Sequence, residues 1–131
     1  MPEFNVPYSS ISFFEGVLNA HQKVVSFQRT KNILFDISLT NGSKIKVLLV
    51  NEYTLGLAAI YKALTEFPGI EYVVTCANWN GYTCEAKDYG RDNNLGVFNL
   101  GEFSGALHWS EPKKYHSKDE DGNPIYPYKS A

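Results

Sequence analysis

The sequence lacks the residues that define disulfide-stabilised and zinc-stabilised proteins. It has only two cysteines, Cys76 and Cys84, which are too few for a disulfide framework. Its three histidines are widely separated, and none has a second histidine four residues away, as a zinc motif on a helix requires. We therefore expect free thiols that are buried or half-buried, and structural or surface roles for His21, His108 and His116.

Long apolar runs and a surplus of basic charge are also missing. No apolar run approaches the roughly 18 residues of a membrane span, and residues 1–5 lack the charged-then-apolar pattern of a signal peptide. The formal net charge is −2, whereas domains that bind nucleic acids usually carry a basic surplus. We expect a cytoplasmic protein that makes no membrane contact and has another protein as its partner. A nucleic acid partner is disfavoured by the charge, although a local basic patch would still allow one.

Apolar and aromatic residues, by contrast, are plentiful enough for one core. The 131 residues are 44% hydrophobic and 15% aromatic, which suits a single domain of ordinary size. From Glu111 the chain becomes polar and contains three of the six prolines. The composition predicts a domain over residues 1–109 and a polar, flexible tail over residues 110–131. Three tyrosines would allow this tail to dock back onto the domain, namely Tyr115, Tyr126 and Tyr128.

Apolar spacing and breaker residues predict an alternation of helices and strands. A stripe with three- and four-residue spacing predicts a first helix from Ser9 or Ser10 to about His21. Thr54 can cap a second helix, which Pro68-Gly69 would end. The remaining segments are strands at residues 23–28, 70–77 and 95–100, a hairpin within residues 32–53, and helices at residues 80–93 and 101–109. This order predicts an α/β protein with a mixed sheet, because strands that alternate with helices run parallel.

The hairpin has a predicted turn and a predicted register. Asn41-Gly42 favours a tight type I′ turn, and a two-residue turn there would pair Asp36 with Val47. Side chains alternate between the faces of a strand. This register therefore places Asp36 on one face with Leu49 and Asn51, and places Lys44 and Lys46 on the other face.

The order of elements and several short motifs resemble a known nuclease family. The motifs occur in order over roughly residues 11–107 and are Phe14-Glu15, Phe35-Asp36-Ile37, residues 56–64, residues 73–75, Trp79, residues 82–87 and residues 95–98. Together they resemble the PD-(D/E)xK nucleases, in particular the Mrr-type branch of the restriction endonuclease-like fold. The resemblance implies an αβββαβ core, with a mixed central sheet flanked by helices.

The family's catalytic residues are only partly present. In active members, an Asp and a Glu or Gln on the next strand hold a divalent metal, and a nearby Lys helps to activate the attacking water. This sequence keeps Asp36, but Leu49 stands where the second acid would be and Asn51 where the lysine would be. The resemblance therefore implies a catalytically degenerate, cofactor-free binding protein. Such relatives suggest a regulatory or immunity-type partner of another protein in a defence or toxin system.

An alternative is a metal-dependent DNA endonuclease of the restriction type. Glu15 matches a position where some relatives of the family place an extra metal ligand. Glu15 and Asp36 would then be the catalytic carboxylates and would hold Mg²⁺. Glu15 also lies three residues after Ser12, which is the spacing of a helix capping box. Lys62 is the candidate replacement for the missing cation, but it falls off its helix's apolar stripe and is expected at the surface.

A further alternative is the binding of a small ligand at residues 78–83. This segment lies at a predicted strand-to-helix turn, where ligands commonly bind in open α/β sheets. It combines aromatic, amide and hydroxyl groups, and the candidate binding residues are Asn78, Trp79, Asn80, Tyr82 and Thr83. The competing interpretation is a helix cap in which Trp79 closes the core.

Overall fold

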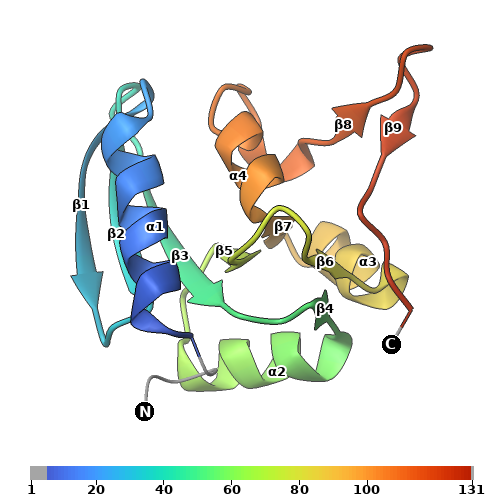
Figure 1. The fold of residues 1–131 in the computed structure, drawn as a ribbon, viewed down its shortest axis with the longest axis horizontal. Helices are drawn as coiled ribbons and strands as arrows, with labels where there is room; N and C mark the ends of the chain where they lie inside the picture. The colour runs from blue at the N-terminus through green and yellow to red at the C-terminus, as the bar shows by residue number, and fades with distance from the viewer. Residues whose placement is uncertain (1–5, 131) are drawn as a thin grey trace.

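A five-stranded sheet forms the centre of the computed structural model, which describes residues 6–130 (Figure 1). The described helices are α1 (Tyr8–Ala20), α2 (Leu57–Glu66), α3 (Cys84–Asp92) and α4 (Leu100–Ala106), with a 3-10 helix at Pro112–Lys114. The strands are β1 (Val24–Thr30), β2 (Leu34–Leu39), β3 (Lys44–Val50), β4 (Thr54–Leu55), β5 (Tyr72–Thr75), β6 (Gly81–Tyr82), β7 (Gly96–Asn99), β8 (Ser117–Lys118) and β9 (Pro124–Ile125).

The central sheet is mixed and has the order β1-β2-β3-β5-β7. Strands β1, β2 and β3 form an antiparallel meander, whereas β5 and β7 continue the sheet parallel to β3. The predicted α/β class with a mixed sheet flanked by helices is therefore confirmed. The order helix, three strands, helix, strand is present as the resemblance implied, and membership of the nuclease family stays a prediction.

Helices cover the sheet on both faces. On one face the Phe14 ring of α1 lies 4.9 Å from Phe35 of β2 and 5.8 Å from Phe103 of α4. On the other face α3 lies against β7, where a side chain at Gly90 would overlap Val97. The continuous apolar run of residues 47–50 favours a central strand covered on both faces, and β3 is the middle strand of the sheet with all four residues fully buried. Figure 1 shows α1 lying over the β1–β3 meander, roughly along the direction of its strands.

The predicted register of the hairpin is wrong by one residue. The residues that lie opposite each other on β2 and β3 include Asp36 with Lys46 and Leu34 with Leu48, so Lys46 shares the face of Asp36. The backbone N–H of Leu39 donates to the carbonyl of Ser43 at 2.9 Å, which leaves three residues in the loop. Of these three, Gly42 alone has a positive φ, at 89°. A type I′ turn needs two positive φ values, whereas one positive φ is typical of a three-residue loop.

Two helices begin later than predicted because short strands precede them. Strands β4 and β6 pair in parallel, with Thr54 opposite Gly81. Thr54 is therefore a strand residue, and α2 begins after Gly56. The same pairing keeps the chain extended through Tyr82, so that Thr83 rather than Asn80 caps α3. A pairing between segments so far apart in sequence leaves no trace in local propensity.

The C-terminal segment packs against the domain. The carbonyl of Pro127 accepts from the N–H of Tyr82 at 3.2 Å, and the N–H of Lys129 donates to the carbonyl of Tyr82 at 2.9 Å. The Tyr128 ring lies 5.8 Å from the Tyr82 ring. This is the docking that the tyrosines of the tail allowed, while its flexibility stays a prediction.

Within residues 6–130, no helix has the length and apolar character needed to cross a membrane. The absence of a signal-peptide pattern was inferred from residues 1–5, which lie outside the described part of the chain.

Candidate functional site

The structure separates Asp36 from Leu49 and Asn51, the positions that correspond to the catalytic residues of the nuclease family. Asp36 lies opposite Lys46 on one face of the sheet. Because side chains alternate along β3, Leu49 and Asn51 lie on the other face, which α1 covers. The expectation that Asp36 shares a face with Leu49 and Asn51 is therefore wrong. The lysine thought to be on the wrong face, Lys46, is the cross-strand neighbour of Asp36.

Glu15 and Asp36 are not brought together either. The carboxylate of Glu15 accepts from the Nε of Arg29 at 3.1 Å, and Arg29 pairs with Phe35 on the face covered by α1. Asp36 follows Phe35 and points to the opposite face, so the sheet separates the two carboxylates. This geometry does not support one metal ion shared by both. Among the described residues, no group of three or more His, Cys, Asp or Glu side chains could hold a metal.

Two other predictions about these side chains can be compared with the structure. α1 begins after Pro7 and has no side-chain cap, so the capping-box interpretation of Glu15 is wrong and its partner is Arg29. Lys62 is exposed on α2, which confirms the predicted surface position.

A cavity of about 440 Å³ lies where the parallel strands end. The chain enters it directly after β3 at Asn51, after β5 at Cys76, and after β7 at Leu100. The carboxyl ends of neighbouring parallel strands are the usual place for ligands in α/β sheets. The described residues that line this cavity are Ser9, Ser10, Phe13, Asn51, Cys76, Ala77, Asn78, Trp79 and Leu100.

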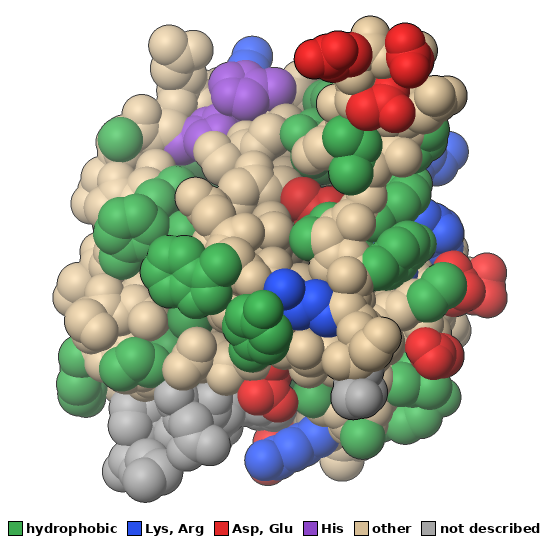
Figure 2. Space-filling model, turned by 45° about the vertical axis from the view of Figure 1, so that its right-hand side comes forward, with side chains coloured by type: hydrophobic (Ala, Val, Ile, Leu, Met, Phe, Trp, Pro, Cys, Tyr) green, Lys and Arg blue, Asp and Glu red, His purple; other side chains and the backbone are tan. Residues whose placement is uncertain are grey.

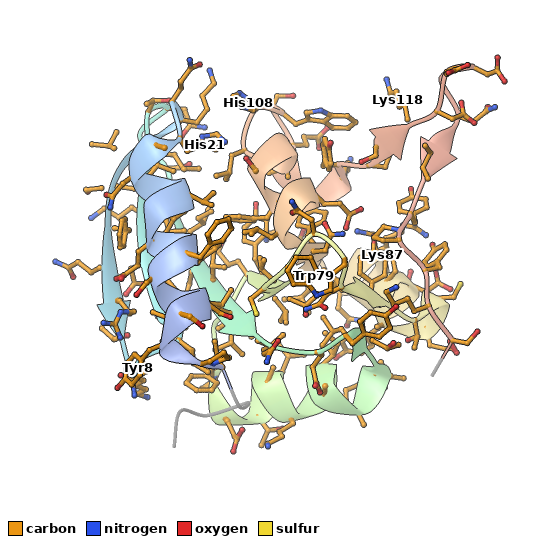
Figure 3. The ribbon with its side chains drawn as sticks, in the orientation of Figure 1. Tyr8, His21, Trp79, Lys87, His108 and Lys118 are labelled. Atoms are coloured by element: carbon orange, nitrogen blue, oxygen red, sulfur yellow. The ribbon has the colours of Figure 1, made fainter. Side chains whose placement is uncertain are left out.

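Two large aromatic side chains at this cavity are exposed. Trp79 is 73% exposed and Phe13 is 61% exposed, so the interpretation in which Trp79 closes the core is wrong. Figure 3 shows Trp79 on the loop between β5 and β6, outside the sheet. Large hydrophobic side chains lie close together on the face shown in Figure 2. Exposed aromatic groups of this size mark interaction sites more often than isolated exposed apolar residues do.

A buried hydrogen-bond network holds the Trp79 loop. The side-chain amide of Asn99 donates to the carbonyls of Asn78 and Asn80, at 3.3 and 3.1 Å. The side-chain amide of Asn80 donates to the hydroxyl of Thr75 at 3.0 Å. Because the carbonyls on both sides of Trp79 are held, the loop presents its indole outward.

The polar groups in the cavity are neutral. Asn51 and Cys76 meet there, with the thiol donating to the Asn51 amide oxygen at 3.3 Å. Burial raises the pKa of the Cys76 thiol, so it stays protonated at neutral pH and is a weak nucleophile. Cys76 is buried as predicted, whereas Cys84 is exposed, so the expectation of burial is wrong for that thiol.

The candidate set at residues 78–83 divides into two groups. Asn78 and Trp79 line the cavity. Asn80, Tyr82 and Thr83 are buried beneath the loop. The hydroxyl of Tyr82 donates to the carboxylate of Glu102 at 2.8 Å, and Thr83 caps α3 by accepting from the N–H of Ala86 at 3.1 Å. These three residues therefore position the loop rather than contact a ligand.

Burial also raises the pKa values of Tyr82 and Glu102, which lie beneath the loop. Removal from water raises the pKa of Tyr82 far above its ordinary value, and the neighbouring Glu102 adds to this effect. Burial raises the pKa of Glu102 as well, against the opposing influence of Lys87. Glu102 forms the capping box of α4 with Asn99. Tyr82 therefore keeps its hydroxyl proton and donates a hydrogen bond to the carboxyl group of Glu102, which also caps α4.

No protein-family model matches the chain, and neither a curated protein nor a solved structure matches it significantly.

Sequence reasoning missed the part of the site that α1 contributes. Phe13 precedes Phe14 of the buried stripe and is off that stripe, so it had to be exposed once Phe14 was buried. An aromatic residue on the polar side of an amphipathic helix was the available signal. The position of Ser9 and Ser10 beside Trp79 had no such signal, because it depends on how α1 crosses the sheet.

Proposed function

We propose that this chain is a non-catalytic binding domain that binds another protein through the aromatic-rimmed cavity at the carboxyl ends of β3, β5 and β7. The observation that carries this proposal is the exposure of Trp79 and Phe13, from two separate elements, at the rim of one cavity. Aromatic side chains are enriched at protein interfaces and dominate their binding energy. A partner would place an apolar side chain between these two rings and hydrogen-bond to the neutral amides below them.

The chemistry of the cavity supports binding rather than catalysis. None of the described lining residues is an acid, a histidine or a lysine, so the lining offers no general acid or base of the usual kind. These described residues also bring no concentration of positive charge to the cavity that would attract a nucleic acid. A regulatory or immunity-type role for the partner interaction rests on the nuclease-family resemblance alone.

Binding of a small ligand in the same cavity is the second candidate. Its volume of about 440 Å³ lies within the range typical of small-molecule sites. The residues predicted for such a ligand contribute Asn78 and Trp79 to the lining. A protein partner would cover the exposed parts of the Phe13 and Trp79 rings. A small ligand would occupy the cavity and leave those parts exposed to solvent.

The test compares a variant that lacks the aromatic rim with a control that lacks an exposed apolar side chain elsewhere on the surface. Phe13→Ala combined with Trp79→Ala removes the rim, whereas Val25→Ala removes a 67% exposed side chain from the edge strand β1. Affinity purification from the native host is followed by reconstitution with each recovered protein in purified form. We expect one partner whose affinity falls at least about thirtyfold in the double variant and is unchanged in Val25→Ala. A partner that binds both variants equally would contradict the proposal.

The same variants require a stability control. Because both rings are mostly exposed, each alanine substitution should change the free energy of unfolding by no more than about 0.5 kcal/mol. Chemical denaturation followed by circular dichroism measures this. A larger loss would mean that the rings support the fold.

The endonuclease alternative is tested in parallel. The purified protein is incubated with plasmid DNA and Mg²⁺ or Mn²⁺, alongside Asp36→Ala and Glu15→Ala. We expect no cleavage above that of a mock purification. Cleavage that either substitution abolishes would overturn the non-catalytic assignment.

A further inference from the structure

A second cavity, of about 270 Å³, lies between α3 and the C-terminal segment. Four of its side chains are cationic, and none of the described residues that line it is acidic. This concentration of positive charge contrasts with the net charge of −2 for the whole chain. The lining consists of Lys87, Gly90, Arg91, Asn94, Lys113, Lys114, Tyr115 and Tyr126.

Lys87 is buried at the inner wall of this cavity and is only 3% exposed. Its Nζ donates to the carbonyl of Val97 at 2.8 Å and lies 4.3 Å from the centre of the Phe98 ring. Figure 3 shows Lys87 between α3 and the returning C-terminal segment. A buried ammonium is costly unless other groups stabilise it. Ring faces and one carbonyl provide part of this stabilisation, and an anion in the cavity would add to it.

Burial lowers the pKa of Lys87 to about 8, although Glu102 acts in the opposite direction. The nearby Arg91 lowers it further. At neutral pH the Lys87 ammonium is therefore still mostly charged, and it loses its proton at a lower pH than an exposed lysine does. An anion bound beside Lys87 would raise this pKa, so that the pKa of Lys87 reports whether the cavity is occupied.

The other three cations are available to a ligand. Each pairs with a carboxylate that is not part of the cavity lining: Arg91 with Asp88 at 3.2 Å, Lys113 with Glu71 at 3.9 Å and Lys114 with Glu111 at 3.0 Å. These pairs are partly or largely exposed, and exposed ion pairs contribute little to stability. Exchanging such a carboxylate for a ligand anion therefore costs little.

The rings of Tyr115 and Tyr126 line the cavity and favour a ligand that carries a flat organic group. The guanidinium carbon of Arg91 lies 4.8 Å from the centre of the Tyr126 ring, and the ring of Tyr115 forms another part of the lining. A guanidinium placed against a ring keeps its N–H groups directed in its own plane, which suits the oxygen pair of a phosphate. The tyrosine rings suit a flat organic group.

We propose that this cavity binds a small phosphate monoester that carries an aromatic or similarly flat group. Lys87 supplies a fixed charge at the inner wall, while Arg91 and Lys113 turn from their carboxylates onto the phosphate. Tyr115 and Tyr126 contact the organic part. The site is separate from the aromatic-rimmed cavity and does not depend on the proposed protein partner.

The experiment titrates the full chain with phenyl phosphate and with inorganic phosphate by calorimetry. Arg91→Gln combined with Lys113→Gln removes two cations of the cavity. Lys23→Gln combined with Lys44→Gln removes two exposed lysines that lie outside this cavity and controls for the loss of surface charge. We expect phenyl phosphate to bind more tightly than inorganic phosphate. The double variant should weaken its binding at least about tenfold, and the control should not.

A second readout keeps the test independent of these variants. Titration of the Lys87 side chain by NMR should give a pKa near 8 without ligand and a higher value with saturating phenyl phosphate. Lys87→Met identifies the resonance. Unchanged affinity in the double variant, or an unchanged Lys87 pKa in the presence of phenyl phosphate, would overturn the proposal, as would the absence of measurable binding by either phosphate.

Discussion

The side-chain amide of Asn99 holds the backbone of Asn80, donating to its carbonyl at 3.1 Å from the end of the neighbouring strand. The same amide reaches the carbonyl of Asn78, so one residue fixes both sides of Trp79. Asn99 also caps α4 by accepting from the N–H of Glu102 at 2.9 Å. One side chain thus connects the last parallel strand, a helix terminus and the loop that carries the exposed indole.

Removal of this side chain should destabilise the protein measurably. Asn99→Ala loses a helix cap and leaves two loop carbonyls without their donor, which predicts a loss of about 2–4 kcal/mol in the free energy of unfolding. Asn99→Ser keeps a capping hydroxyl but is too short to hold both carbonyls. Urea denaturation should rank wild type above Asn99→Ser and Asn99→Ser above Asn99→Ala. Equal stability of Asn99→Ser and wild type would show that the loop is held by other contacts.

Docking of the C-terminal segment depends on a glycine. A side chain at Gly81 would overlap the carbonyl of Pro127 and approach Lys129, whereas a side chain at Gly16 in α1 would meet open space. Gly81→Ala should therefore release residues 124–130 and expose them to proteolysis, with some loss of stability. Gly16→Ala is the matched control and should leave stability unchanged or increase it by about 0.5–1 kcal/mol. Limited trypsin digestion with mass spectrometry distinguishes the two, and equal protection in both variants would exclude this role for Gly81.

The buried ammonium of Lys87 predicts a dependence of stability on pH. Its pKa is lowered from 10.5 to about 8 in the folded chain by burial. Between these values the unfolded chain binds more protons than the folded one, so stability rises with pH. The rise should reach roughly 3 kcal/mol across the interval. Below pH 8 the buried Lys87 ammonium destabilises the folded chain to its full extent. This destabilisation is relieved as the side chain loses its proton.

Denaturation curves between pH 8 and pH 10 measure this rise in wild type and in Lys87→Met. The substitution removes the titrating group and should flatten the slope. Above pH 10 two buried tyrosines act in the opposite direction, and one of them is Tyr82, whose pKa is raised far above its ordinary value. Burial, with help from Glu71, raises the pKa of Tyr72 to about 12, so stability should then fall as unfolded tyrosine ionises. A slope that persists in Lys87→Met would assign the dependence to another residue.

Much of the fold was predictable because it follows from local pattern. The apolar stripe around Phe14 and the apolar run of residues 47–50 in β3 set the period and the burial of their elements. Pro68-Gly69 ended α2 close to the predicted place. The alternation of helices and strands in the second half then required parallel neighbours, and the sheet has them.

The hairpin shows where local pattern was insufficient. Asn41-Gly42 marks the turn correctly, but the same pair serves loops of two or of three residues. The choice between them reverses which residues of β3 share a face with Asp36. Pairing of β3 with β5, where Leu48 lies beside Val73, joins the face of Asp36 to the side covered by α3. That pairing lies outside the hairpin and could not be read from it.

The candidate site was predictable only in part. A strand-to-helix turn with aromatic and amide groups indicated residues 78–83, and Trp79 does lie at a cavity. Whether Trp79 faced the core or solvent depended on Asn99, which lies about 20 residues along the chain and meets the loop only through the parallel pairing of β5 and β7. The cationic cavity depended similarly on the return of the C-terminal segment to α3.

The sequence by itself determined the α/β class, the order of most elements and the central place of β3, because periodicity and breaker residues act over a few neighbouring positions. Tertiary structure alone decided that Asp36 lies opposite Lys46 with the sheet between it and Glu15, and that Trp79 is exposed while Lys87 is buried. Those outcomes depend on contacts between segments distant in sequence, where register and packing rather than local propensity set the lowest free energy.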